Sequence, residues 1–153
     1  MAEGYSISIT GLAELEWKLV SLDRRVKRKI VRKAVKAGAD IIKHQAEENA
    51  RSTVGGEMGT LISRRLGTSR FRKQKRGSYG VSLRIRPGPL DFIWITQDGT
   101  REYVPSALEF GHVDRAGNFV PAMPYMRPAY DSKAEEATRM IGTILKIGIE
   151  ITR

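Results

Sequence analysis

Four of the six prolines in this chain lie at 105, 121, 124 and 128, and they restrict the backbone of that stretch more than any other residues do. Each proline fixes its own φ angle and lacks a backbone N–H, which favours a rigid, non-repeating path over a loose tail. Large apolar side chains interrupt the same stretch, and a solvated linker would not carry so many. We therefore expect a corner over 103–130 that packs on the body of the domain, with Phe110 in the core and Gly111 at a positive φ.

The residues of this corner resemble those of one protein family. Glu109-Phe110-Gly111 combines an acidic residue, an aromatic residue and a glycine, and the run from Pro121 to Ala129 reads Pro-Ala-Met-Pro-Tyr-Met-Arg-Pro-Ala. This combination resembles the small morphogenesis proteins of long-tailed bacteriophages (siphophages), which are head–tail joining or tail-completion proteins of the neck. The resemblance also takes in the Gly11-Leu12 start, the basic helix after it and the closing helix, and it departs over 51–80.

The resemblance implies a non-enzymatic structural protein of the virion. Such a protein is expected to form a homo-oligomeric ring, here a hexamer, that completes the tail and joins it to the head connector. The implied partners are other copies of the chain, tail tube or tail terminator proteins, and head–tail connector or stopper proteins, with phage DNA contacted in passing. The implied location is the neck of the virion, after assembly in the host cytoplasm.

Length and composition limit the fold classes, sites and partners that are possible for this chain. A chain of 153 residues with 41% apolar residues suits one soluble globular domain, which we expect to span 1–153. The chain has no cysteine, so disulfides and cysteine-bound zinc are excluded. The sequence shows neither a signal peptide nor a membrane span, which predicts a cytosol-like compartment and no membrane partner. A net charge of +10 favours anionic partners without choosing among nucleic acid, anionic membranes and acidic proteins.

A long basic helix is predicted in the first third of the chain. After a short strand at 5–10 and a first helix from Leu12, Asp23 is placed to cap a second helix whose apolar stripe runs from Val26 almost to Arg51. Its charge run is either a solvated face or a surface for phosphate or an acidic neighbouring subunit. The predicted contact residues of this helix are Arg25, Arg28, Lys29, Arg32 and Lys36.

Residues 51–80 are rich in glycine, serine, arginine and lysine, and little apolar periodicity survives in them. This composition predicts a long, mobile basic loop that becomes ordered against a partner. Its cations and its one phenylalanine suit either docking between subunits or contact with nucleic acid. The predicted contact residues of the loop are Arg64, Arg65, Arg70, Phe71, Arg72 and Lys73.

The rest of the chain predicts an α+β fold. Alternation over 79–85, an apolar run over 90–96 and a return over 101–104 predict a small antiparallel sheet, covered on one face by the long N-terminal helix and a C-terminal helix. The last helix is expected to open at Tyr130-Asp131. Ile147, Ile149 and Ile151 are expected to form a strand-like tail.

The sequence predicts no enzyme, no cofactor and no metal site. His44 has no second histidine at the spacing of a helical zinc site, and His112 with Glu109 and Asp114 lacks any accompanying catalytic motif. Glu109 is instead expected to pair with Arg127 or with a neighbouring subunit. The competing hypothesis is a nucleic-acid-binding protein whose basic helix and loop contact phosphate. The predicted contact residues of the corner are Glu109, Phe110, Tyr125 and Arg127.

Overall fold

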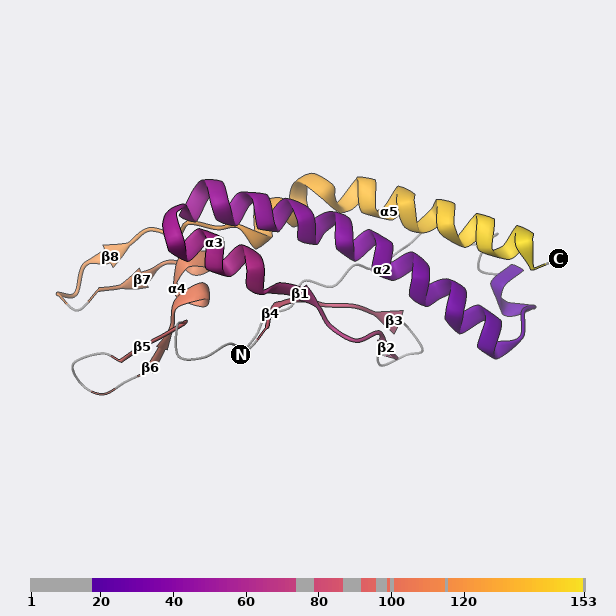
Figure 1. The fold of residues 1–153 in the computed structure, drawn as a ribbon, viewed down its shortest axis with the longest axis horizontal. Helices are drawn as coiled ribbons and strands as arrows, with labels where there is room; N and C mark the ends of the chain where they lie inside the picture. Colours follow the sequence, from indigo (N-terminus) through magenta and orange to yellow (C-terminus); the bar gives the residue numbers. More distant parts are fainter. Residues whose placement is uncertain are drawn as a thin grey trace. The chain divides into compact units, whose positions relative to one another are not determined.

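The computed structural model describes residues 18–73, 79–86, 92–95, 99, 101–114 and 116–152. Two long helices dominate them, α2 (Arg24–Asn49) and α5 (Met126–Ile151), joined by shorter helices and short strands (Figure 1). The predicted α+β class is confirmed. The predicted strand at 5–10 and the Gly11-Leu12 start lie outside the described residues.

The start of α2 is where the sequence predicts it. The chain turns at Ser21 and Leu22, and the Oδ1 of Asp23 accepts a hydrogen bond of 2.8 Å from the backbone N–H of Arg25. Asp23 thus satisfies one of the donors that a helix leaves unpaired at its N-terminus. No described helix is both long enough and apolar enough to cross a bilayer.

The chain divides into two compact units, where the sequence predicts one domain. Unit 1 comprises 1–42, 68–84 and 132–153, and unit 2 comprises 43–67 and 85–131. Each long helix contributes residues to both units, because α2 passes from one to the other after Ile42 and α5 after Asp131.

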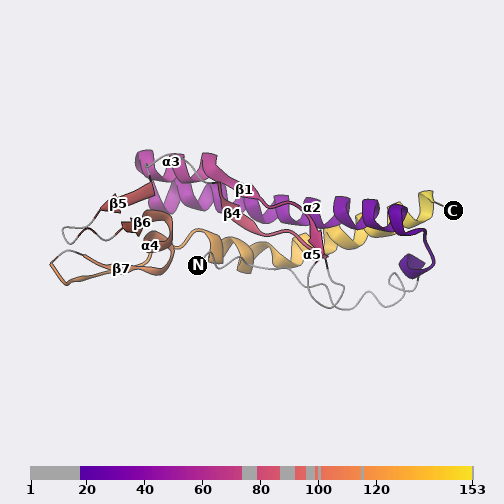
Figure 2. The same ribbon diagram turned by 90° about the horizontal axis from the view of Figure 1, so that it is seen from below.

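Unit 1 is built on α2 and α5, which lie side by side (Figure 2). Gly38 of α2 lies against Ile141, and Ile30 lies against Gly148, so the two helices run antiparallel. A Cβ on Gly38 would come within 2.6 Å of the Cδ1 of Ile141, so glycine is what allows the helices to approach. Their shared core consists of Leu19, Ala34, Ile141, Leu145 and Ile149, and a smaller core consists of Val35, Ala39 and Val81.

The predicted loop over 51–80 is wrong for most of its length. In unit 2, α2 continues into a π-helical turn, η1 (Ala50–Val54), and then after Gly55 into α3 (Gly56–Arg65). Gly55 and Gly56 have φ values of 69° and 55°, which turn the chain between η1 and α3. Gly59 sits against the carbonyl of Ala50 with no room for a Cβ. Helix α3 is only ten residues long, and its glycines and arginines interrupt the apolar spacing that would reveal it in the sequence.

The remaining strands form separate two-stranded ladders rather than one sheet. Among the described residues, β1 pairs with β4, β2 with β3, β5 with β6 and β7 with β8. The β5–β6 pair is antiparallel, as predicted, with Ile93 opposite Tyr103. Their bounds are β1 (Leu66–Thr68), β2 (Arg72–Lys73), β3 (Tyr79–Gly80), β4 (Leu83–Ile85), β5 (Ile93–Ile95), β6 (Arg101–Tyr103), β7 (His112–Val113) and β8 (Phe119–Val120).

The proline-rich corner contains more regular structure than predicted. Residues Val104–Phe110 form helix α4, with Pro105 in its first turn, where the missing N–H costs nothing. Phe110 is 54% exposed, so its predicted place in the core is wrong. Gly111 follows α4 with φ 78°, as predicted, and a Cβ there would lie 2.9 Å from the carbonyl oxygen of Val120.

The last helix begins earlier and ends later than predicted. It starts at Met126 rather than Tyr130, and it runs through Ile151 without a strand-like tail. Ile149 belongs to the core of unit 1, whereas Ile147 and Ile151 are exposed. Ile147, Ile149 and Ile151 therefore lie on one helix, and its apolar residues extend beyond the face that is buried.

The contact between Gly38 and Ile141 gives a test of the helix pair. Gly38→Val should lower the free energy of unfolding by about 2 to 3 kcal/mol, since it overpacks a buried contact. In an Ile141→Ala background, which removes the two nearest atoms, the same change should cost much less. Urea unfolding of the four proteins measures this coupling, and equal costs in both backgrounds would contradict the packing described.

Candidate functional site

The residues of the predicted corner meet at the N-terminus of α5, inside unit 2. Glu109 lies on α4 and is only 6% exposed. Its Oε2 accepts hydrogen bonds from the backbone N–H groups of Tyr125 and Met126 at 2.8 and 3.0 Å, and its Oε1 accepts one from Arg127 at 2.9 Å. We call this arrangement the Glu109 cap.

The Glu109 cap completes the first turn of α5. A helix leaves its first four backbone N–H groups without partners inside the helix. At α5 these positions are Tyr125, Met126, Arg127 and Pro128; Glu109 binds the first three, and the fourth is a proline with no N–H. The first turn has no acidic residue of its own. Glu109 therefore supplies, from another helix, the negative charge that the positive end of the helix dipole favours.

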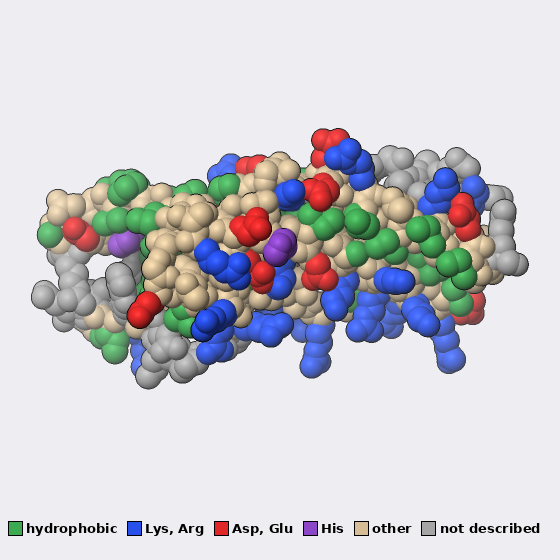
Figure 3. All heavy atoms as spheres, turned by 45° about the horizontal axis from the view of Figure 1, so that its top comes forward, with side chains coloured by type: hydrophobic (Ala, Val, Ile, Leu, Met, Phe, Trp, Pro, Cys, Tyr) green, Lys and Arg blue, Asp and Glu red, His purple; other side chains and the backbone are tan. Residues whose placement is uncertain are grey.

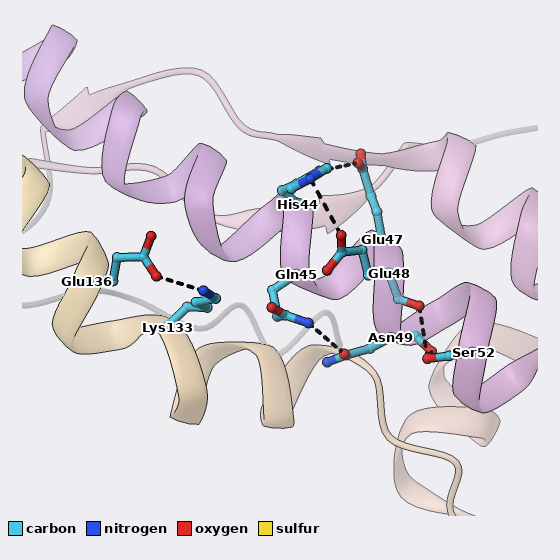
Figure 4. A network of polar contacts seen from close by, with 8 residues as sticks. All are labelled: His44, Gln45, Glu47, Glu48, Asn49, Ser52, Lys133 and Glu136. Atoms are coloured by element: carbon cyan, nitrogen blue, oxygen red, sulfur yellow. Dashed lines mark hydrogen bonds and ion pairs between the residues drawn. The ribbon is translucent and has the colours of Figure 1, made fainter.

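Two further contacts hold the same junction. Tyr125 is 1% exposed, and its hydroxyl donates a hydrogen bond of 3.2 Å to the carbonyl of Pro105 on α4. The Nδ2 of Asn49, at the end of α2, donates one of 3.1 Å to the carbonyl of Tyr125. Gln45 in turn donates to the Oδ1 of Asn49 at 3.1 Å (Figure 4). The end of α2, helix α4 and the start of α5 are thus joined by buried or half-buried polar contacts.

The predicted pairing of Glu109 with Arg127 takes a different form. The carboxylate of Glu109 accepts a hydrogen bond from the backbone N–H of Arg127, and the side chain of Arg127 is exposed. Tyr125, predicted as a contact residue, is instead buried. Glu109 and Tyr125 are therefore part of the framework, whereas the side chain of Arg127 lies at the surface.

The acidic residues near His112 are also structural. Asp114 closes the β7–β8 hairpin, where its Oδ1 accepts hydrogen bonds of 2.8 Å from the backbone N–H groups of both Ala116 and Asn118. These bonds, led by the one from Asn118, hold the pKa of Asp114 below its usual value. Glu109 accepts hydrogen bonds from the backbone N–H groups at the start of α5. Within the described part of the chain, no group of three or more histidine, aspartate or glutamate side chains is arranged to hold a metal ion.

An exposed apolar patch surrounds the Gly111 turn in unit 2. It consists of Phe110, Val113, Phe119 and Met123, which are 54%, 60%, 70% and 38% exposed. Val113 and Phe119 are directly opposite in the β7–β8 ladder, and the Phe119 ring lies close to Gly111. The N–H of Met123 donates a hydrogen bond of 2.7 Å to the carbonyl of Leu108 on α4. We call these four residues the apolar patch.

Unit 1 carries a groove with a cationic lining. Its volume is about 640 Å³, and α2 forms one wall with all five of its predicted contact residues. The segment after β1 forms the other wall with Arg70, Thr68 and Ser69, while Phe71 and Val81 also line it. Figure 3 shows Lys and Arg side chains gathered along α2. We call this feature the cationic groove; its cations are Arg25, Arg28, Lys29, Arg32, Lys36 and Arg70.

The second wall of the cationic groove is fixed by two hydrogen bonds between Ser69 and Ser82. The N–H of Ser69 donates to the carbonyl of Ser82 at 2.8 Å, and the N–H of Ser82 donates to the Oγ of Ser69 at 2.9 Å. Phe71 packs against the small core of Val35, Ala39 and Val81. None of the six cations forms an ion pair with a described carboxylate.

The other predicted residues are not part of this groove. Arg64 is exposed on α3, and Arg65 is half-buried there with its carbonyl accepting from the N–H of Arg86 at 2.7 Å. Arg72 is exposed on β2, and Lys73 is on the same strand. His44 is 72% exposed beside Glu47 and Glu48 on α2 (Figure 4).

Sequence reasoning missed the residues that form hydrogen bonds with partners far away in the sequence. Asn49 carried no signal beyond its place near the end of a predicted helix. Pro105 is predicted to stiffen the corner through its ring, whereas in the structure its carbonyl also accepts a hydrogen bond from the hydroxyl of Tyr125. Pro128 also carries a signal for the start of α5 that the prediction at Tyr130 did not take up, because proline is tolerated in the first turn of a helix.

No protein-family model, curated protein or solved structure matches this chain. The resemblance to phage neck proteins therefore stays a prediction, carried by the residues quoted for it.

The Glu109 cap gives a prediction about stability. Glu109→Gln should lower the free energy of unfolding by about 2 to 3 kcal/mol, because it removes the charge and turns an NH₂ group toward backbone donors. Glu135→Gln, an exposed change on the same helix α5, is the control and should alter stability by less than about 0.5 kcal/mol. Chemical unfolding measures both, and equal effects would contradict the cap.

The hairpin carboxylate gives a prediction about pH. Because the pKa of Asp114 is lowered from 3.8 in the folded protein, its ionised form contributes stability above that value, and this contribution is lost as the pH falls through the folded pKa. Wild type and Asp114→Asn should therefore differ most near neutral pH and converge in acid. Thermal unfolding midpoints from about pH 7 to about pH 3 measure the difference, and a pH-independent difference would contradict it.

Proposed function

We propose that this chain is a non-enzymatic structural protein of the neck of a tailed phage, where copies form a ring that completes the tail and joins it to the head connector. The ring is proposed to be a hexamer. Its further partners are tail tube or terminator proteins on one side and connector or stopper proteins on the other.

The observation that carries this proposal is the apolar patch beside the Glu109 cap. The residues that resemble the phage family, Glu109 to Gly111 and Pro121 to Ala129, build a rigid junction and hold large apolar side chains outward from it. Soluble monomers seldom expose adjacent large apolar side chains without a partner to cover them. A rigid support keeps such a surface preorganised, which lowers the entropy lost on association.

A ring follows from how such a surface is used. A patch that binds a different surface on the next copy makes a head-to-tail contact, and these contacts close when the rotation between subunits permits. Exposed cations of unit 2, such as Arg64 and Arg127, supply charged contacts that orient a neighbouring copy or ring.

The carboxylates near the junction also support an assembly role. Glu109 is bound by three backbone donors, and Asp114 by the turn of its own hairpin. Both side chains are thus occupied in holding the framework that presents the apolar patch.

Loss of the apolar patch should prevent assembly and leave the fold intact. We expect the protein to form rings alone or on tail tubes of the phage that encodes it, and Phe110→Ser/Phe119→Ser to remain single subunits under both conditions. Both side chains are exposed, so the thermal unfolding midpoint should change little. Native mass spectrometry and electron microscopy measure the oligomer.

The control is Val20→Ser/Met140→Ser, which removes two exposed apolar side chains from unit 1 and should assemble normally. Wild-type protein that stays a single subunit and does not bind tubes would overturn the proposal. So would rings formed by the double phenylalanine variant as readily as by the wild type.

A further inference from the structure

We propose that the cationic groove of unit 1 binds the phosphodiester backbone of nucleic acid without reading its sequence. The groove shares no residue with the apolar patch, and the proposal does not depend on the ring. Its ligand is a row of phosphates on one nucleic-acid strand, whether that strand is single or is one edge of a duplex.

The charge of the groove is the first argument. Among the described residues that line it, six are cations and none is acidic, and none of the six is neutralised by a described carboxylate. Like charges held together along a wall repel one another, so the site gains stability when an anion enters. Four of the six are arginines, whose planar guanidinium groups bind phosphate oxygens through two parallel hydrogen bonds.

The spacing of the cations is the second argument. Arg28, Lys29, Arg32 and Lys36 lie three, four, seven and eleven residues after Arg25, so the five share one face of α2. From Arg25 to Lys36 this face extends over roughly 16 Å at the rise of an α-helix. A line of cations of that length matches a chain of regularly repeated phosphates better than a single small anion.

The scarcity of exposed apolar contacts favours nucleic acid over an acidic protein. Protein interfaces are depleted of charge, and of lysine in particular, at their buried centres. Here cations occupy the wall of the groove, and both apolar lining residues, Phe71 and Val81, also pack into the small core of unit 1. Nucleic-acid sites have the opposite composition, with cations along the path of the backbone.

The structure of the second wall makes the groove a preformed site. Ser69 and Ser82 fix the wall by two hydrogen bonds, and Phe71 is anchored in the core beside them. Arg70 therefore faces the groove from a segment that is already ordered, across from the arginines of α2. A preformed site loses less conformational entropy on binding than flexible cationic tails do.

The test uses the full-length protein and two fluorescein-labelled probes, an oligothymidylate and a mixed-sequence duplex of the same length. Fluorescence anisotropy over a range of salt concentrations gives the slope of log affinity against log salt. If all six cations neutralise phosphates, the slope should be about −4 for the single strand and about −5 for the duplex. A second duplex of unrelated sequence should bind equally well.

The groove variant is Arg28→Gln/Arg32→Gln, and the control is Lys33→Gln/Lys146→Gln. Both remove two positive charges, but Lys33 and Lys146 are exposed on α2 and α5 and do not line the groove. The groove variant should bind at least about tenfold more weakly and reduce the magnitude of the slope by about 2. The control should keep the wild-type slope.

Phe71→Leu separates the aromatic contribution from the charge. Leucine keeps most of the packing against Val35 and Val81, whereas it cannot stack on a base. If a base stacks there, the single strand should bind about fivefold or more weakly to this variant while the duplex is less affected.

Three results would overturn the proposal. The first is a flat salt dependence in the wild type, and the second is an equal loss in the groove and control variants. The third is competition by polyglutamate as effective as that by unlabelled oligothymidylate at equal charge, which would assign the groove to an acidic polypeptide. Ring formation by the groove variant, followed by native mass spectrometry, should match the wild type, so a failure here is distinct from a failure of the proposed assembly role.

Discussion

The start of α5 inside unit 2 is the constraint on which the junction depends. Backbone N–H groups removed from water must find acceptors, and a buried carboxylate must find donors. Glu109 and the first turn of α5 meet both requirements at once, through charge-assisted hydrogen bonds that are about twice as strong as neutral ones. The position of Glu109 also fixes the rotation of α4. With Glu109 inward, Phe110 lies about 100° further around the helix, on its exposed side.

The two units carry surfaces of different chemistry. Unit 2 presents large apolar side chains on a framework of buried polar contacts. Unit 1 presents six groove cations that form no ion pair with a described carboxylate, on a helix pair that glycines bring close together. Apolar burial supplies most of the free energy of protein association, whereas clustered cations act through counterion release on polyanions. The positive charge behind the net +10 is therefore concentrated locally, because six of the cations line one groove.

The sequence predicted those elements whose signal is local. The Asp23 cap, the length of α2, the β5–β6 pairing and the positive φ of Gly111 all depend on neighbouring residues. It failed where tertiary contacts decide. Helix α3 is too short for its apolar spacing to stand out among glycines and arginines. Phe110 faces outward because its neighbour Glu109 is held inward by Tyr125, sixteen positions after Glu109. The sequence did not predict the groove itself. The predicted contact residues on α2, with Arg70 and Phe71, line it, whereas Thr68, Ser69 and Val81 were not predicted.

The short ladders limit how an extended segment of another chain can add to this protein. Every described strand belongs to a two-stranded ladder, so each has one edge that pairs with no other described strand, and such an edge has backbone groups able to template a further strand. Strands of two or three residues offer too few such groups to hold an incoming strand. Extended segments of other chains are thereby kept from adding to the ladders indiscriminately, and recognition is left to side chains.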